Sequence, residues 1–201
     1  MTGIDGAAGV EFDRGGRGAR DRIVAAARVL FYRDGIHATG VDELIQYAHV
    51  SKRTFYQYFS TKRELVQEYL RDLDATRAIP RERALAASER PARTRLLAMF
   101  DSTPETRIRG CPYHNAAVEA ASALPEVHDI VHKHKLAFIA DLIGVCAELG
   151  VQDSHKLGHQ LAVVFEGGLS LATTLNDTAP MVYARSAADD LISAALRAPR
   201  D

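Results

Sequence analysis

Thirteen residues from 50 to 62, VSKRTFYQYFSTK, combine four aromatic side chains with three cationic ones. On a helix, Phe55 and Phe59 lie four residues apart and share one face, which predicts a buried seam. The other faces carry hydrogen-bond donors and hydroxyl groups, a chemistry that suits contact with a polyanion. These outward residues are Lys52, Arg53, Thr54, Tyr56, Gln57 and Tyr58, with Lys62 just beyond.

Such a helix has the composition of one that reads a nucleic-acid groove. Lys52, Arg53 and Gln57 can donate hydrogen bonds to base edges, and the Tyr56 ring or hydroxyl can contact a thymine methyl or the backbone. Thr54, Tyr58 and Lys62 are placed to hold phosphates, together with amides at the N-terminus of the next helix. A helical hairpin with a solvated charged face has the same pattern, so the residues alone leave both interpretations open.

Charge is unevenly distributed along the chain. Residues 14–63 hold ten Lys and Arg against four Asp and Glu, a net +6, whereas the whole chain carries a net charge of −1. The rest of the chain therefore carries −7. A basic segment of this kind is the footprint expected for a polyanionic partner, or else a solvated helical surface.

The surrounding sequence predicts helices and no strands. A helix is expected over 19–34, ended by Gly35; a second is opened by Thr39, a third capped by Ser51 and a fourth begun by a capping box at 61–64. Further helices are expected over 91–102, 112–122, 125–149, 154–175 and 181–197. The sequence thus predicts an all-α protein. Its parts are a flexible arm over 1–18, a three-helix helix-turn-helix bundle over 19–65 and a C-terminal helical effector-binding and dimerisation domain over 66–201.

The segment GIHATGVDELIQYAHVSKRTFYQYFSTKRELVQEYL, within residues 19–70, resembles the DNA-binding module of the tetracycline-repressor (TetR) family of bacterial regulators. The resemblance implies a homodimer that binds double-stranded DNA at a pseudo-palindromic operator, as a repressor released by a small-molecule effector. It implies that Thr39 joins the DNA-binding residues named above. Many members have glycine in the turn where this chain has His49, so the sequence predicts a histidine at positive φ there.

The C-terminal part resembles the family less closely. RGCPYHNAAVEAAS, from Arg109 to Ser122, resembles a Gly-Cys-Pro and Asn motif that begins a helix beside the effector cavity in a subset of these regulators. Cys111 near that helix start is either a small packed residue or an oxidant-sensing thiol. The expected effector-binding residues are Met99, Phe100, Tyr113, Asn115, Glu119, His134, Phe138, Phe165 and Glu166.

The last two helices are expected to pair with their symmetry mates in a four-helix bundle. The glycines at 167 and 168 favour close helix crossing at this dimer seam, or a kink beside the cavity. The seam residues expected from the apolar pattern are Leu161, Phe165, Leu169, Leu191 and Ala195.

Other classes of function find little support. The sequence has no G-x-S-x-G, P-loop, H-E-x-x-H or dinucleotide-binding glycine motif, so no catalysis and no cofactor are expected. His128 and His132 lack a nearby acid or cysteine at a matching step, and no metal site is expected. Neither a signal peptide nor a membrane span is evident, and two distant cysteines fit the reducing cytoplasm. The remaining alternative is a small-molecule-binding or enzymatic helical protein that retains a non-functional DNA-binding module.

Overall fold

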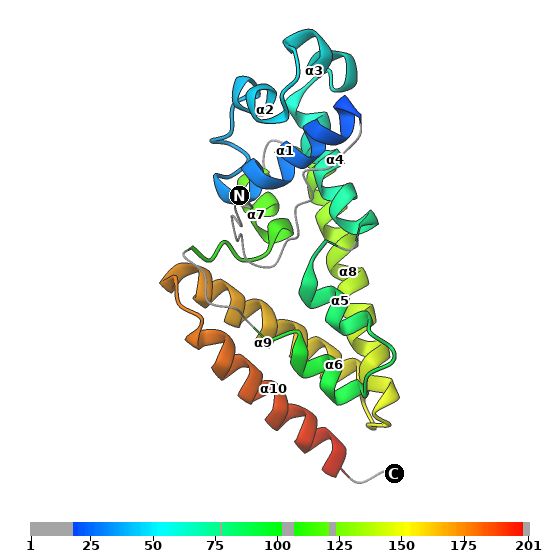
Figure 1. Ribbon diagram of the computed structural model, residues 1–201. Helices are drawn as coiled ribbons and strands as arrows, with labels where there is room; N and C mark the ends of the chain where they lie inside the picture. Colours follow the sequence, from blue (N-terminus) through cyan, green and yellow to red (C-terminus); the bar gives the residue numbers. More distant parts are fainter. Residues whose placement is uncertain (1–17, 77, 102–106, 121–123, 199–201) are drawn as a thin grey trace. The chain divides into compact units, whose positions relative to one another are not determined.

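The computed structural model describes residues 18–76, 78–101, 107–120 and 124–198, and every regular element in these ranges is an α-helix (Figure 1). The predicted all-α class is therefore confirmed. The chain divides into two compact units, one formed by Met1–Ala78 with Cys111–Lys133 and the other by Ile79–Gly110 with His134–Asp201. The expected arm over 1–18 lies outside the described residues except for its last one.

Unit 1 is built on a bundle whose interior is closely packed. Ile23, Leu30, Leu44, Phe55 and Leu65 are each at most 1% exposed. Helix α1 packs against α2, α3 and α4, and α2 also packs against α3. The helices of this unit are α1 (Ala19–Arg33), α2 (Val41–Ala48), α3 (Lys52–Tyr58), α4 (Lys62–Ala75), α7 (Pro112–Ala120) and the part of α8 (Pro125–Glu148) up to residue 133.

Local side-chain chemistry fixes where these helices begin. The Ser51 hydroxyl accepts the Thr54 N–H at 3.0 Å, as expected for a cap of α3. The Thr61 hydroxyl accepts the Glu64 N–H at 3.2 Å, and the Glu64 carboxylate accepts the Ser60 N–H at 2.8 Å. The expected capping box at α4 is thus present with one change, because the carboxylate binds the residue before the cap.

The turn between α2 and α3 is tight. His49 has φ 51° and ψ 51°, so the predicted left-handed histidine is confirmed. The turn is closed by the Val50 N–H, which donates to the Ile45 carbonyl at 3.2 Å. Residue 49 therefore reverses the chain and places Ser51 to cap the next helix.

Unit 2 contains α5 (Pro80–Ala86), α6 (Ala92–Ala98), α9 (Ser154–Leu175), α10 (Ala179–Arg197) and the remainder of α8. Helix α5 was not among the expected helices. Pro80 could mark either the first residue of a helix or the end of the preceding one, so its presence did not reveal α5. The helix is also only seven residues long, which gives little periodic pattern. Helices α9 and α10 form an antiparallel pair, which Figure 1 shows at the C-terminal end of the chain.

Unit 1 extends beyond the expected boundary at 65–66. It includes all of α4 and also takes in α7, which is distant in sequence. The Tyr113 hydroxyl of α7 lies 2.9 Å from the Leu70 carbonyl and 2.8 Å from Asp74 Oδ1, both in α4. None of the helices in the described ranges has the length and apolar character that crossing a membrane requires.

Candidate nucleic-acid interface

Helix α3 has two distinct faces. Phe55 is completely buried and Phe59 is 4% exposed, with their ring centroids 6.3 Å apart. Tyr56 and Tyr58 are each 45% exposed, although they lie next to these residues in sequence. Lys52, Arg53 and Gln57 are also exposed. One face therefore anchors the helix in unit 1, while the other presents five side chains with hydrogen-bonding groups to solvent.

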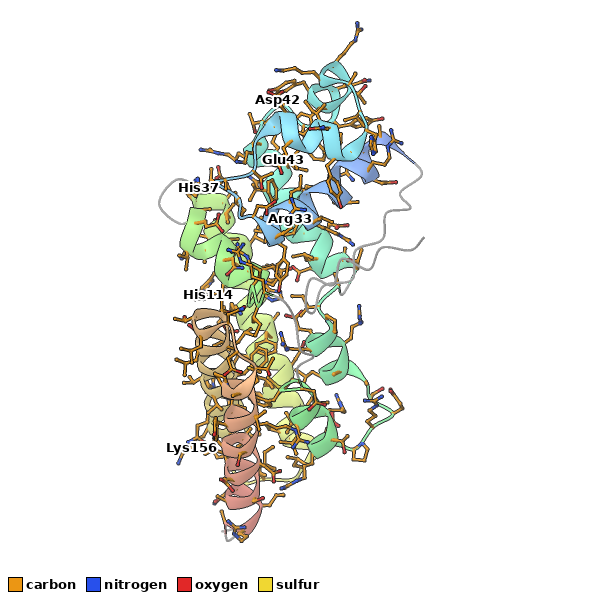
Figure 2. The ribbon with its side chains drawn as sticks, turned by 60° about the vertical axis from the view of Figure 1, so that its left-hand side comes forward. Arg33, His37, Asp42, Glu43, His114 and Lys156 are labelled. Carbon is orange, nitrogen blue, oxygen red and sulfur yellow. The ribbon has the colours of Figure 1, made fainter. Side chains whose placement is uncertain are left out.

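The donors on this face are weakly engaged by the protein. Lys52 Nζ lies 3.4 Å from Asp42 Oδ1, and both side chains are mostly solvent-exposed. Figure 2 shows Asp42 and its neighbour Glu43 on α2. Among the described residues, neither Arg53 nor Gln57 hydrogen-bonds to a side chain or forms an ion pair. The surface is thus open to a ligand that offers hydrogen-bond acceptors.

Lys62 is the first residue of α4 and follows α3 closely in sequence. Its side chain is less exposed than those of Lys52, Arg53 and Gln57. Its Nζ lies 3.5 Å from the carbonyl oxygen of His37, in the loop between α1 and α2. Burial lowers the pKa of Lys62, and the negative charge of Glu119 acts in the opposite direction. Lys62 therefore combines a position suited to phosphate with an existing contact to the protein.

Thr39 does not fit its expected roles. Its side chain is completely buried, and its hydroxyl donates to the Gly35 carbonyl at 2.7 Å. The N-cap of α2 is Gly40, without a side-chain cap. The prediction that Thr39 caps α2 and contacts DNA is therefore wrong for its side chain, which instead closes the loop after α1.

Residues 23–69 match the sequence model of a family described as bacterial regulatory proteins, tetR family. The match contains α2, α3 and the start of α4, the elements that carry the exposed donors. The N-terminal unit carries a tetR-family DNA-binding domain. This domain makes the chain a DNA-binding transcriptional regulator.

Solved structures extend the likeness over most of the chain. A TetR-family transcriptional regulator from Streptomyces coelicolor is 24% identical with a TM-score of 0.77, and the alignment covers 89% of this chain and 96% of that one. A tetR-type regulator assigned in Streptomyces avermitilis is 29% identical with a TM-score of 0.68, covering 86% and 99%. The reduced form of NemR from Escherichia coli is 20% identical with a TM-score of 0.73, covering 87% and 97%. The fold is therefore TetR-like over the aligned part of the chain. The search of curated proteins found no match to the sequence.

The residues expected to bind an effector fall into two groups. In unit 2, Phe165 lies between Phe100 and Phe138, with ring centroids at 5.7 and 5.6 Å. Met99 is completely buried in the same unit. Lys135 Nζ donates a hydrogen bond to the Glu166 carboxylate of α9 at 2.5 Å. The structure thus brings together an aromatic cluster and an adjacent ion pair.

His134 also belongs to unit 2. It is 7% exposed, and its Nε2 lies 3.1 Å from Glu82 Oε1 in α5. The sequence placed His134 on an apolar face, but gave no indication of its acidic partner because α5 was not expected.

The second group of expected effector residues belongs to unit 1. Tyr113 is completely buried, with its hydroxyl bound by α4 as described above. The Glu119 carboxylate accepts the N–H of His37 at 3.0 Å. Asn115 lies on the same helix, and its N–H donates to the Cys111 carbonyl at 3.0 Å. The polar groups of Tyr113 and Glu119 therefore hold elements of unit 1, a role that the sequence analysis missed.

The residues expected at a dimer seam are largely internal to the protomer. Leu161, Phe165 and Leu169 are at most 6% exposed, so they form part of the core of unit 2 and cannot line an outer surface. Helix α9 carries apolar residues on several sides, and the residues predicted from the sequence pattern lie on its inward side. The outward side carries Val163, Leu171 and Leu175, which are 73%, 55% and 62% exposed.

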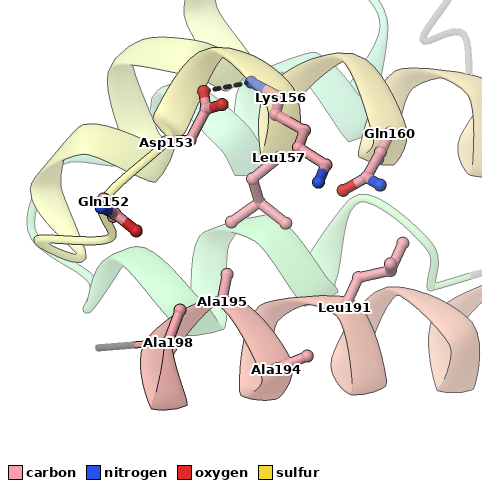
Figure 3. Close-up of a pocket in the computed structure, with 9 residues that line it drawn as sticks. All are labelled: Gln152, Asp153, Lys156, Leu157, Gln160, Leu191, Ala194, Ala195 and Ala198. Carbon is pink, nitrogen blue, oxygen red and sulfur yellow. Dashed lines mark hydrogen bonds between the residues drawn. The ribbon is translucent and has the colours of Figure 1, made fainter. Parts of the chain in front are cut away.

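Leu191 and Ala195 are half-buried and line an open groove of about 630 Å³ between α9 and α10 (Figure 3). Its apolar side also includes Leu157 and Ala194. Lys156, whose N–H donates to the Asp153 carboxylate at 2.8 Å, lies on the polar rim. These two predicted seam residues thus remain accessible, unlike the three in α9.

Proposed function

We propose that this regulator is a sequence-specific repressor that binds an operator as a homodimer and leaves it when a small molecule binds unit 2. The observation that carries the proposal is the two-faced α3. Two buried phenylalanines hold the helix, and its exposed face combines Lys52, Arg53 and Gln57 with two tyrosines. A helix of this kind fits a major groove about 12 Å wide.

Within the groove, Lys52, Arg53 and Gln57 donate hydrogen bonds to base edges, while Tyr56 contacts a thymine methyl or the sugar-phosphate backbone. Tyr58, Thr54 and Lys62 bind phosphates. Thr54 already shares a hydrogen bond with Ser51 at 2.8 Å, so its hydroxyl orientation is set before DNA binds. In a two-fold dimer, two such helices enter successive major grooves of a pseudo-palindrome, about one helical turn apart.

Dimerisation uses the outer side of α9 and α10 in this proposal. Val163, Gly167, Leu171 and Leu175 follow one another at four-residue steps and are all exposed, so they form a continuous stripe along α9. On α10, Val182 and Tyr183 are 64% and 75% exposed. An apolar stripe of this length is typical of a surface that a second helix pair covers. Leu191 and Ala195, which line the groove of Figure 3, belong to the same interface in this proposal.

Effector binding is proposed for unit 2, near Met99, Phe100, His134, Phe138, Phe165 and Glu166. Aromatic side chains beside a small number of polar groups are typical of small-molecule sites. An effector that binds better to the conformation with low DNA affinity weakens operator binding by its differential affinity for the two states.

The test is selection of duplex DNA from a random pool by the purified protein, followed by titration of the enriched sequence at several salt concentrations. The proposal predicts an inverted repeat whose affinity falls steeply as salt rises. Failure of a folded dimer to enrich any sequence would instead support a small-molecule-binding protein with an inactive DNA-binding module.

A further inference from the structure

Three of the four polar groups of His37 are bound within unit 1, namely its backbone N–H, its backbone carbonyl and Nε2. Its backbone N–H donates to Glu119 Oε2 at 3.0 Å, and its Nε2 hydrogen-bonds to the Glu119 carbonyl. Its own carbonyl accepts Lys62 Nζ at 3.5 Å. Figure 2 shows His37 in the loop that joins α1 to α2. One loop residue therefore connects the end of α7 with the first residue of α4.

Gly35 provides independent evidence that the Glu119 carboxylate has a defined place against this loop. Gly35 has φ +98°, which favours glycine, and a Cβ added there would lie 3.0 Å from Oε2 and 3.1 Å from Oε1 of Glu119. The carboxylate thus packs against the Gly35 Cα and binds the amide two residues later. Both contacts hold the loop in one position relative to α7.

Lys62 is the proposed phosphate-binding residue that depends on this loop. Burial lowers the pKa of its ammonium group, and the charge of Glu119 partly offsets that effect. The His37 carbonyl, 3.5 Å from Nζ, is a hydrogen-bond acceptor for the ammonium on the protein side. A displacement of the His37 backbone therefore changes where the Lys62 ammonium lies.

We infer that Glu119 is a positioning residue for DNA binding, acting through His37 on Lys62. The inference rests on the proposed phosphate contact of Lys62. Helix α7 begins directly after Gly110 and Cys111, where the chain passes from unit 2 to unit 1. The contact of Lys62 with phosphate thereby depends on where the last turn of α7 lies.

A different role for Glu119 makes the opposite prediction. Its charge could compete with phosphate for Lys62, in which case removing the charge strengthens DNA binding. Two substitutions separate the roles. Glu119→Gln keeps the reach and an acceptor oxygen for the His37 N–H but removes the charge, whereas Glu119→Asp keeps the charge and shortens the reach by one methylene.

The experiment measures the affinity of each full-length variant for a fluorescent duplex carrying the selected operator, and for a scrambled duplex, between 50 and 200 mM salt. We expect Glu119→Gln to keep the wild-type dependence on salt. Glu119→Asp should lower the slope of log K against log salt by up to about 0.9, the value for one phosphate contact. Its affinity deficit is then about threefold larger at 50 mM than at 200 mM salt.

Matched controls remove the general effects of the substitutions. Glu126 lies on α8 in unit 1, and its carboxylate is 3.6 Å from Arg63, the residue next to Lys62. Glu126→Gln and Glu126→Asp repeat the same chemical changes without touching His37. Thermal unfolding of every variant verifies the fold. If Glu119→Asp does not fold, Glu119→Met is compared with Glu119→Gln, from which it differs by lacking an acceptor oxygen.

A double-mutant cycle that combines Glu119→Asp with Lys62→Ala completes the test. The inference requires that Lys62→Ala lowers the slope and that Glu119→Asp has no further effect on the slope in that background. It is overturned if Glu119→Asp keeps the wild-type slope, if Glu119→Gln binds more tightly than Glu126→Gln, or if the Glu119→Asp effect persists without Lys62. If Lys62→Ala itself leaves the slope unchanged, the proposed phosphate contact fails first, and the inference fails with it.

Discussion

Adjacent glycines in α9 lead to opposite predictions for the same substitution. Gly168 is buried, and a Cβ added there would lie 2.6 Å from the Cβ of Ala184 in α10. Gly167 is exposed, and a Cβ added there would meet nothing within 4 Å. We predict that Gly167→Ala stabilises the protomer and that Gly168→Ala destabilises it or leaves it unchanged.

The magnitudes follow from helix propensity and packing. Alanine in a helix interior is favoured over glycine by about 1 kcal/mol, and Gly167→Ala gains this in full. Gly168→Ala gains the same amount, but the Ala184 Cβ is attached directly to the backbone and cannot rotate away. The two helices must therefore move apart, at an overpacking cost of about 1–3 kcal/mol. The free energies of unfolding of the two variants should then differ by about 1–3 kcal/mol.

Equilibrium denaturation in urea, followed by far-UV circular dichroism at one fixed protein concentration, measures the difference. The second variant in the cycle is Ala184→Gly, which removes the methyl group opposite Gly168. In the double variant Gly168→Ala with Ala184→Gly, the methyl group has moved to the other helix and the clash with the Ala184 Cβ is absent. The two changes should therefore be non-additive, with a coupling energy above about 0.5 kcal/mol.

Two results would refute the reasoning. Equal effects of alanine at Gly167 and Gly168 would mean that α9 and α10 are not in close contact at Gly168. Additive effects in the double variant would mean that Ala184 is not the residue that limits the space. A stabilising effect of Gly167→Ala that disappears as protein concentration rises would instead place Gly167 in a closely packed dimer seam.

The remaining predictions concern the core, the DNA-binding surface, one buried thiol and the dimer surface. Phe55→Ala should lower the free energy of unfolding by about 3–5 kcal/mol in urea denaturation, because Phe55 is completely buried. Gln57→Ala should relax base preference at one or two positions in duplex selection, without the uniform loss expected of a phosphate contact. Burial raises the pKa of Cys146 to about 12, so iodoacetamide should modify this thiol at pH 9 only in denaturant. Because the unfolded thiol loses its proton first, the contribution of Cys146 to stability should fall as pH rises from about 9 to 12, as urea denaturation at pH 7 and 10 can show. Leu171→Glu should yield monomers in sedimentation experiments, whereas Leu136→Glu, at a side chain equally 55% exposed on α8, should not.

Local features of unit 1 were predictable from the sequence because their causes are local. The apolar pair at Phe55 and Phe59, the Ser51 cap and the left-handed His49 each depend on a few neighbouring residues. The exposed face of α3 follows directly, because burying one face of a short helix leaves the others outward.

Features that depend on distant partners were not predictable in the same way. Nothing near Tyr113 or Glu119 in sequence indicates that α7 packs with the N-terminal bundle, since their partners Leu70 and His37 lie 43 and 82 residues away. The buried Thr39 hydroxyl likewise depends on how the loop after α1 closes.

Helix α9 shows a further limit. Its apolar residues occur on opposite sides, so periodicity cannot tell which stripe faces its own protomer. The buried Leu161 and the exposed Val163 look equally suited to either role. What separates them is which side of α9 its neighbours cover: Phe100 and Phe138 contact Phe165, and Ala184 of α10 lies against Gly168.

The donors proposed to bind DNA differ in how strongly the protein engages them. An exposed pair such as Lys52 with Asp42 contributes at most about 1 kcal/mol, so DNA can displace it at little cost. Among the described residues, Arg53 and Gln57 have no side-chain partner that DNA would have to displace. Lys62 is different, because its ammonium is partly desolvated and held by a loop that α7 anchors. The proposed base reading by α3 would therefore be largely independent of the rest of the chain. At the proposed Lys62 contact, a change in α7 should alter DNA affinity without altering sequence preference.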